Sequence, residues 1–442
     1  MQWWKVSPSN HSVPGAPRAP MSGSLGTTLF ASIAIQALNV ITGIVLARAL
    51  GPQSRGEVAA ILLWTLLVLT AGQIGLPEAV TYETARGSVR ARTVVGTAMR
   101  SCVVLSLALM GVGALVLTAT LSRYGTSVRT TGYIFLAVMP LYVGANVGTA
   151  ALQGLRAMGA FNAARSAVPL VTASVLVGLA ATGTLTVRTA IYAYLATYLV
   201  ALVTSVVLLR SRRLWSFDFD RSTLRPLLSY GARSQVSFVT STLTERLDLL
   251  LISVVLGATK LGLYVVAVTL TSSAALAAST VGLVAFPQVA GLAPGPERAE
   301  AARRFILLAL ALSTAIALPI FALTPQLLDV LFGQAFTSVA NVCRVLIAAS
   351  VFLALGQLLA SVLRGLGRPL DSGIAGAVGL AVTIVLLAAL LPTLGLMGAA
   401  ITSLVAYIVT AGMMLQRVLR VLEVPVIYLL GIGRAPLGPE AR

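Results

Sequence analysis

The sequence predicts an all-α integral membrane protein with twelve transmembrane helices in two related six-helix lobes. Of its 442 residues, 57% are hydrophobic and only 10% are charged, whereas a soluble domain usually carries about 25% charged residues. Apolar segments long enough to cross a bilayer of about 30 Å recur from end to end. Only helices or closed barrels satisfy their backbone groups in lipid. Because the alternating polarity of barrel strands is absent, the segments are predicted to be helices.

Each predicted helix is one of these apolar segments, bounded by polar or glycine-containing turns. The first six are expected at residues 25–49, 57–78, 94–121, 129–153, 162–183 and 188–210. The second six are expected at 230–256, 261–290, 304–324, 337–363, 370–391 and 396–418. They define an N-lobe (23–210) and a C-lobe (230–420), joined by a polar linker (211–229). Residues 1–22, proline-rich and without periodicity, and residues 421–442 are expected to be tails, the first of them disordered.

The positive charges predict the orientation of the chain. The net charge is +18. If the twelve helices alternate, one side of the membrane holds 23 basic residues and the other holds six. Basic residues concentrate on the cytoplasmic side, so both termini, both tails and the linker are expected there. The same rule accounts for the charge without a nucleic-acid partner, which a soluble basic protein would suggest.

Motifs of enzyme chemistry are absent from the sequence. The single histidine, His11, lies in the polar tail, and Cys102 and Cys343 lie far apart in apolar segments. We interpret both cysteines as small buried hydrophobic residues. The sequence has no phosphate-binding loop of the GxxxxGK[ST] type, no HExxH and no CxxC. We therefore expect no enzyme, no catalytic residue, no metal site and no cofactor.

Glycine motifs indicate that the second half repeats the first. Leu-Gly, four residues and Gly recur at the ends of the first and seventh predicted helices, as Gly51 with Gly56 and Gly257 with Gly262. A second match pairs Gly154 with Gly365 at nearly the same offset. Six spans separate the equivalent helices, so the repeats are parallel. Parallel repeats usually enclose a substrate cavity at their interface, and transport proceeds by alternating access.

Polar residues at membrane depth are the candidate lining of such a cavity, because they usually face a bundle interior. Gln36 and Asn39 share one stripe of the first helix with Ser32 and Gly43. Asn146 in the fourth helix and Gln357 in the tenth occupy equivalent positions of the two repeats. These four amides are candidate substrate-binding groups.

Arginines within or beside the helices are the remaining candidates. A guanidinium in a cavity of low dielectric binds phosphate or carboxylate oxygens in pairs. Arg246 either serves in this way or is neutralised by Glu245 or Asp248, although Asp248 lies off its stripe. Arg344 either lines the cavity or extends to the membrane surface from near a helix end. Arg48 either lines the cavity or anchors the outer interface.

Short motifs in both halves resemble the polysaccharide and oligosaccharide-lipid flippases of the multidrug/oligosaccharidyl-lipid/polysaccharide (MOP) superfamily. They are ARALGPQSRGE, LQGLRAMGAF, RLDLLLISVVLGATKLGLYVVA, PQLLDVLFGQAF and LGLMGAAITSLVAY, within about residues 24–420. The resemblance implies a V-shaped bundle that moves a polyprenyl-pyrophosphate-linked glycan to the outer leaflet of a bacterial plasma membrane. It also implies membrane lipids as partners, with a polysaccharide polymerase or glycosyltransferases as candidates. Arg246 and Asp248 match an Arg-x-Asp that this family often has in the seventh helix.

A cation-coupled multidrug extruder of the same superfamily is the alternative function. Such extruders usually have an acidic residue in the first helix, where this chain has Gln36 and Asn39. Glu245 and Asp248 are the candidate groups for coupling to a proton or cation in either case. The sequence does not identify the coupling ion or the glycan.

Overall fold

The computed structural model describes residues 21–86 and 90–429, and this part of the chain is helical with short turns and no strand. The predicted tails lie largely outside the described residues. The first half contains α1 (Met21–Gly72), α2 (Leu76–Arg86), α3 (Ala91–Thr120), α4 (Thr126–Phe135), α5 (Val138–Gly154), α6 (Met158–Ala181) and α7 (Val187–Ser211). The second half contains α8 (Arg221–Val255), α9 (Gly257–Gly291), α10 (Pro296–Ala322), α12 (Ala340–Gly365), α13 (Pro369–Leu394) and α14 (Leu396–Leu422). Between α10 and α12 lie the short turns α11 (Thr324–Leu327), η2 (Leu328–Phe332) and η3 (Gln334–Val339), and α15 (Val426–Leu429) follows α14.

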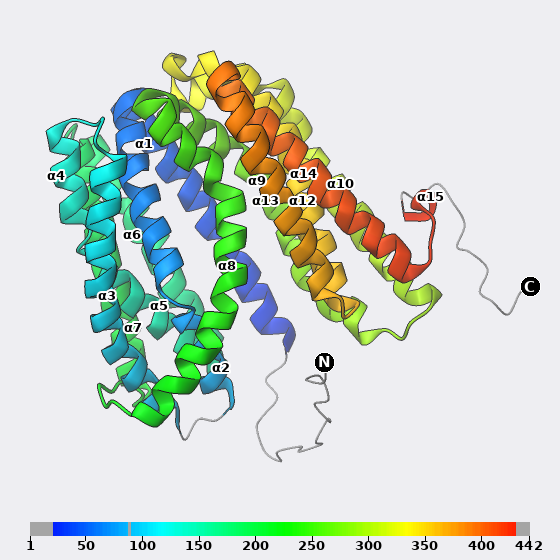
Figure 1. The fold of residues 1–442 in the computed structure, drawn as a ribbon, viewed down its shortest axis with the longest axis horizontal. Coiled ribbons are helices and arrows are strands. Elements are labelled where there is room, and N and C mark those ends of the chain that lie inside the picture. Colours follow the sequence, from blue (N-terminus) through cyan, green and yellow to red (C-terminus); the bar gives the residue numbers. More distant parts are fainter. Residues whose placement is uncertain (1–20, 87–89, 430–442) are drawn as a thin grey trace, which may run out of the picture.

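The twelve-helix prediction is confirmed. Nine segments of the described chain are long and apolar enough to cross a membrane. The first of them, Phe30–Gly72, contains two helices, because Gly51 breaks α1 with φ 71° and ψ 177°. Helices α8 and α9 complete the set. Both are long helices that run alongside the others (Figure 1).

Several helix bounds differ from the sequence prediction. The second predicted helix ends at Gly72, and α2 follows a break in which Ile74 and Gly75 have positive φ angles of 52° and 59°. The fourth is divided into α4 and α5, because Pro140 cannot donate a hydrogen bond to Leu136. The seventh begins at Arg221, since the side chain of Asp220 caps the helix by accepting from Ser222 N at 3.0 Å.

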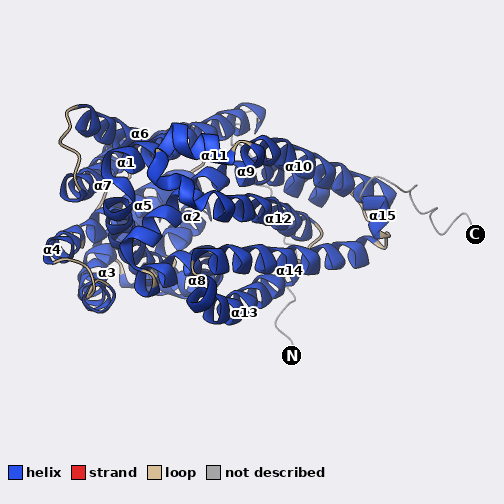
Figure 2. Cartoon of the chain, turned by 90° about the horizontal axis from the view of Figure 1, so that it is seen from above, coloured by secondary structure: helices blue, strands red, loops and turns tan. Residues whose placement is uncertain are grey.

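The helices form two lobes that meet at one end and diverge toward the end where α1 begins and α14 ends. In Figure 1 the N-lobe (α1–α7) lies on the left, the C-lobe (α9–α14) on the right, and α8 runs between them. The view from above shows the same two groups of helices (Figure 2). The V shape implied by the resemblance is therefore present.

Equivalent glycines form equivalent close contacts, which confirms the parallel repeat. Gly51 and Gly257 both have positive φ angles, of 71° and 81°. A Cβ on Gly56 would lie 1.8 Å from Ala258 O, and one on Gly262 would lie 1.9 Å from Pro52 O. The two repeats therefore touch backbone to backbone where the lobes meet. Small residues allow such approaches between membrane helices.

Polar contacts also join the lobes at this closed end. Trp64 Nε1 donates to Ser253 Oγ at 2.9 Å, and Tyr124 OH donates to Ser253 O at 2.9 Å. Arg48 donates to the carbonyl of Val330 in η2. Arg48 thus binds backbone between the lobes.

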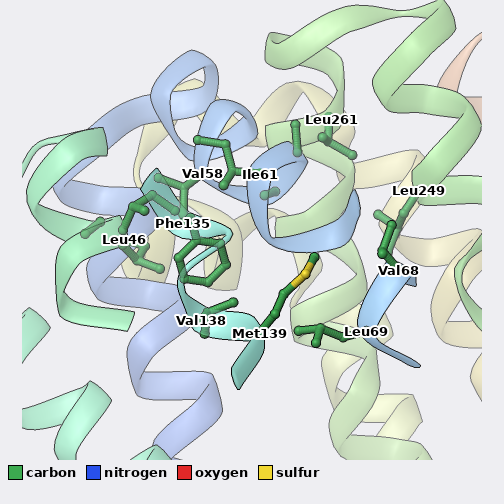
Figure 3. Packing of buried hydrophobic residues seen from close by; sticks show 14 of the residues in the cluster. Leu46, Val58, Ile61, Val68, Leu69, Phe135, Val138, Met139, Leu249 and Leu261 are labelled. Carbon is green, nitrogen blue, oxygen red and sulfur yellow. The ribbon is translucent and has the colours of Figure 1, made fainter. Parts of the chain in front are cut away.

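Apolar packing holds the same region together. Phe135 at the end of α4 is fully buried against side chains from α1 and α5 (Figure 3). Leu249 of α8 and Leu261 of α9 belong to the same cluster. Part of the C-lobe core therefore continues into the N-lobe core, which fixes the closed end.

Candidate substrate cavity

Helix α8 places the charged residues at membrane depth between the lobes. Thr242, Arg246, Leu249 and Leu250 follow helical spacing and line one cavity of about 570 Å³, here called the α8 cavity. Arg55, Tyr142 and Tyr198 of the N-lobe form its other walls. Arg55 and Arg246 outnumber the one carboxylate in the wall, Glu245, so this cavity favours an anion.

Asp248 faces the C-lobe. It is 9% exposed, and its Oδ2 accepts from Tyr264 OH of α9 at 2.8 Å and from Ser403 Oγ of α14 at 3.4 Å. Oδ1 accepts from Leu249 N at 2.7 Å. Asp248 and Ser403 line a cavity of about 340 Å³, the Asp248 cavity, which Glu245 and Arg246 also line. A buried carboxylate bound only by neutral donors is suited to binding a proton or a cation.

Two further cavities adjoin these. The α13 cavity, of about 540 Å³, lies among α8, α12, α13 and α14 and shares Glu245 and Gln357 with the Asp248 cavity. The α2 cavity, of about 900 Å³, lies among α2, α5, α6 and the start of α8. It shares Tyr142 with the α8 cavity. Glu245 lines three of the four cavities, and Tyr142 lines both the α8 cavity and the α2 cavity.

The structure brings together some of the predicted site residues. Arg246, Glu245, Asp248, Gln36 and Gln357 all line the Asp248 cavity. Within it, Gln36 Nε2 donates to Ser272 Oγ of α9 at 3.0 Å. Asn146 lines the α2 cavity in the N-lobe.

Three predicted site residues lie elsewhere. Asn39, Arg48 and Arg344 line none of the four cavities described. Asn39 is exposed on α1, and Arg48 binds Val330 O at the closed end. The guanidinium of Arg344 lies 5.8 Å from the ring centroid of Phe321 on α10. This position at the start of α12 fits a side chain that extends from a helix end.

The acidic neighbours of Arg246 do not pair with it. No ion pair within 4.0 Å joins Arg246 to Glu245 or to Asp248 among the described residues. The carboxylate of Asp248 is turned to Tyr264 and Ser403 instead. Arg246 is exposed to the cavities that it lines. Its donors are therefore available to a ligand, and a guanidinium is best satisfied there by paired oxygens.

Arg55 is the cavity residue that sequence reasoning missed. From the sequence it resembles an anchor at the outer interface, yet it is 8% exposed and lines the α8 cavity opposite α8. Its Nε has no hydrogen-bond partner within the described part of the chain. The one nearby feature that could have indicated its burial is Gly56. The helix packs closely against Gly262 of α9 at Gly56, so this end of the helix faces the other lobe.

Gln235 fixes the lower part of α8 to the N-lobe. Its Oε1 accepts from Gly75 N at 2.7 Å, and its Nε2 donates to Ala71 O at 3.2 Å and to Thr70 O. The amide of Gly75 and the carbonyls of Thr70 and Ala71 have no helical partners at the break between α1 and α2. The Gln235 amide binds all three, on both sides of the break. This holds α8 beside α2.

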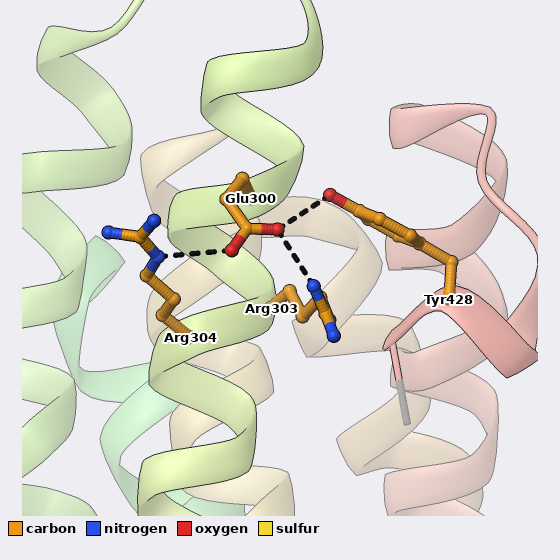
Figure 4. A network of polar contacts seen from close by, with 4 residues as sticks. All are labelled: Glu300, Arg303, Arg304 and Tyr428. Atoms are coloured by element: carbon orange, nitrogen blue, oxygen red, sulfur yellow. Dashed lines mark hydrogen bonds and ion pairs between the residues drawn. The ribbon is translucent and has the colours of Figure 1, made fainter. Parts of the chain in front are cut away.

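A second polar network fixes the C-terminal segment to the C-lobe. Glu300 of α10 binds Arg303 at 3.1 Å and Arg304 at 3.0 Å, and it accepts from Tyr428 OH of α15 at 2.8 Å (Figure 4). The Arg303 guanidinium lies 5.1 Å from the Tyr428 ring centroid. This network is remote from the cavities, and we assign it a structural role.

A family model of polysaccharide biosynthesis proteins matches residues 45–341, about two thirds of the chain. The chain belongs to this family. The relationship agrees with the resemblance of its motifs to MOP-superfamily flippases. No curated protein sequence matches the chain significantly.

Solved structures confirm the MOP fold for this polysaccharide biosynthesis protein. An inward-facing multidrug resistance MATE family transporter of the superfamily is 18% identical, with a TM-score of 0.72 over 92% of this chain and 100% of that one. The lipid II flippase MurJ in an inward closed conformation is 12% identical, with a TM-score of 0.73 over 91% and 89%. An outward-facing MATE family transporter gives 0.60 at 18% identity, over 91% and 96%. The outward-facing structure thus superposes less well on this chain than the inward-facing and inward closed ones.

Proposed function

We propose that this protein moves a polyprenyl-pyrophosphate-linked oligosaccharide from the cytoplasmic to the outer leaflet of a bacterial plasma membrane, for surface polysaccharide biosynthesis. The observation that carries the proposal is the guanidinium of Arg246 at membrane depth, which lines two cavities and forms no ion pair within the described part of the chain. A pyrophosphate needs such a group, because desolvating its charge is costly without paired donors.

The path of the substrate follows from the shape of the molecule. The lobes are apart at the end where α1 begins and α14 ends, and from the distribution of basic residues we assign this end to the cytoplasmic side. A lipid-linked glycan enters there, and its pyrophosphate reaches Arg246 and Arg55. Closing this end and opening the Gly56–Gly262 contact then exposes the glycan to the outside. This is transport by alternating access, without covalent chemistry.

Asp248 is the coupling group of this proposal. Its carboxylate is buried among neutral donors, two residues from Arg246. Binding of a proton or a cation would neutralise it and change the electrostatic cost of holding an anion nearby. Glu245 lines the same cavity and is the second candidate. Asp248→Asn is expected to keep binding of the lipid-linked glycan but to remove the dependence of transport on the ion gradient.

A cation-coupled multidrug extruder remains the alternative, and Asp248 is the feature that favours it. A cationic drug requires an acidic cavity, however, and the α8 cavity contains two arginines and one carboxylate. The charge of this cavity therefore favours the glycolipid.

Depletion of the protein tests the proposal in cells. The lipid-linked sugar pool would be measured while its leaflet is labelled with a membrane-impermeant sugar-oxidising reagent or lectin. We expect lipid-linked glycan to accumulate shielded from the reagent. An unchanged pool together with lost resistance to cationic dyes would contradict the proposal and establish the extruder.

A further inference from the structure

The α2 cavity differs in chemistry from the α8 cavity beside it. Its charged side chains are Glu78 and Arg165, so its wall carries no net charge. The wall of the α8 cavity carries two guanidinium groups and one carboxylate. The α8 cavity is therefore the better site for an anion. The uncharged balance of the α2 cavity suits a neutral ligand instead.

Hydrogen-bond acceptors dominate the wall of the α2 cavity. Thr81 already donates its hydroxyl hydrogen to Ala150 O at 3.1 Å, and Thr149 donates to Ala145 O at 2.8 Å. Their oxygens can therefore only accept from a ligand. The amides of Asn146 and Gln153, which offer both donor and acceptor, complete this part of the wall.

Two acceptors in the wall lack partners among the described residues. Gln73 is 3% exposed, and no described group donates a hydrogen bond to its Oε1. Glu78 Oε2 is likewise buried without a described donor. Leaving such a buried acceptor unpaired is unfavourable. Rotation of either side chain toward the cavity would give it a donor from a ligand.

Aromatic rings border the same space. Tyr82 of α2 and Tyr230 of α8 are stacked with centroids 4.2 Å apart, and Tyr142 stands where the two cavities join. A sugar presents both hydroxyl groups and apolar C–H groups. The acceptors of the wall can bind the hydroxyl groups, and the faces of the tyrosine rings can pack against the C–H groups.

We propose that the α2 cavity is the carbohydrate subsite and that it binds uncharged, hydroxyl- or amide-bearing sugars next to the pyrophosphate. The inference rests on the proposed function and deepens it. The shared residue Tyr142 supports this division, because the first sugars are bonded directly to the pyrophosphate. With the pyrophosphate at Arg246, those sugars extend past Tyr142 toward Asn146 and Gln153.

Binding measurements on the purified full-length protein in lipid nanodiscs test the subsite. Two ligands are compared: undecaprenyl pyrophosphate without sugar, and the lipid-linked oligosaccharide that accumulates in cells depleted of this protein. We expect the wild type to bind the glycosylated lipid roughly ten- to a hundredfold more tightly, as two or three added hydrogen bonds would give.

Variants of the wall should remove this difference selectively. Asn146→Leu, Gln153→Ala and Glu78→Gln are each expected to shrink the difference severalfold, because each removes or weakens one hydrogen bond to the sugar, and the triple variant is expected to abolish it. Glu83→Gln, on the same helix but outside the cavity, is the matched control and should keep the difference. Gln153 is exposed, and its side chain forms no hydrogen bond with another described residue, so its variant tests the subsite even if Asn146→Leu does not fold.

The outcomes separate this inference from the proposed function. If the wild type binds both lipids equally, or if the wall variants keep the wild-type difference, the carbohydrate subsite is overturned while pyrophosphate binding stands. If the wild type binds neither lipid, or if no lipid-linked glycan accumulates on depletion, the proposed function fails and the subsite fails with it.

Discussion

Arg246 and Asp248 are two positions apart on α8, yet their surroundings differ. Asp248 is buried among three hydrogen-bond donors, whereas Arg246 opens to two cavities and has no ion pair. Two residues correspond to about 200° around a helix, so opposite environments are expected. The two-residue spacing thus places the anion-binding group, Arg246, and the group that can take up a proton or cation, Asp248, on different sides of α8.

Substitution of Arg246 should abolish transport. Without the bidentate guanidinium, the pyrophosphate loses charge-assisted hydrogen bonds that are worth about 1.5–3 kcal/mol each. We expect Arg246→Ala to reduce binding of undecaprenyl pyrophosphate at least tenfold, and Arg246→Lys to retain part of it. Arg344→Ala is the control, because Arg344 lies against Phe321 outside the cavities. Equal binding by Arg246→Ala and wild type would remove Arg246 from the site.

Asp220 allows a prediction of pH dependence. Hydrogen bonds from Ser222 and Thr223 hold the pKa of Asp220 at about 2, below its ordinary value of 3.8. A lowered pKa stabilises the folded state above the ordinary value, and this contribution is lost as the pH falls toward 2. Asp220→Ala should therefore lower the thermal midpoint at neutral pH by an amount that shrinks below about pH 4. Asp220→Asn should keep most of the cap, and a pH-independent Asp220→Ala effect would contradict this account.

Breaks and close approaches decide how the helices are placed. The break at Ile74–Gly75 frees backbone groups that Gln235 then binds, which ties α8 to the N-lobe. The contact between Gly56 and Gly262 brings the first turns of two equivalent helices together. The break bound by Gln235 and the Gly56–Gly262 contact together place α8 and Arg55 around the α8 cavity.

Removal of the Gln235 amide should loosen α8. Gln235→Leu leaves Gly75 N and two carbonyls without their partner, at a cost of about 1–3 kcal/mol. We expect a lower unfolding midpoint and faster hydrogen exchange of the amides near residues 73–76. Gln53→Leu is the control, since Gln53 is exposed and bonds only to Glu57. Unchanged exchange in Gln235→Leu would show that the cap does not hold the break.

A methyl group at the Gly56–Gly262 contact should separate the lobes. The added Cβ would meet backbone at 1.8 Å in Gly56→Ala and at 1.9 Å in Gly262→Ala, so the helices must move. We expect either variant to widen the closed end, measured as the distance between spin labels on α4 and η2. Gly111→Ala is the control, because nothing lies within 4 Å of a Cβ at that position. An unchanged distance would contradict the interpretation of this contact.

Sequence reasoning succeeded where a feature is local. The Leu-Gly-x4-Gly repeat predicted the equivalence of the two lobes, and the spacing of Arg246 and Asp248 predicted their different faces. It failed where packing decides. Gly72, Gly75 and Pro77 indicate a break near Ile74, but they do not fix which residue ends the helix, and the prediction placed that end at residue 78. The burial of Arg55 depends on how its helix meets α9, and a basic residue near a predicted helix end otherwise indicates an interface.

At the scale of the whole molecule, contacts between the lobes stabilise one state of a transport cycle. Trp64 and Tyr124 both bind Ser253 at the closed end, and the opposite end is open. A transporter must break these contacts to open outward. Their strength therefore sets the population of the outward state.

Loss of these hydrogen bonds should shift that population. Trp64→Phe and Tyr124→Phe each remove about 0.5–1.5 kcal/mol from the closed end, and together they should raise the outward-open fraction roughly five- to a hundredfold if their effects add. Spin-label distance distributions across the closed end measure this. Tyr192→Phe, whose hydroxyl contacts only Arg188 on the same helix, should leave the distribution unchanged. A double variant without a longer distance component would contradict the assignment of the closed end.

Translocation in reconstituted vesicles tests the central claim most directly. Purified protein would be placed in liposomes that contain the lipid-linked oligosaccharide accumulated on depletion, and an impermeant lectin would report how much glycan crosses to the other leaflet. We predict that wild-type protein and Arg344→Ala move the glycan and that Arg246→Ala does not. If wild-type protein leaves the glycan in its original leaflet under an imposed proton or sodium gradient of either sign, or if Arg246→Ala moves it as fast as wild type, the account is contradicted.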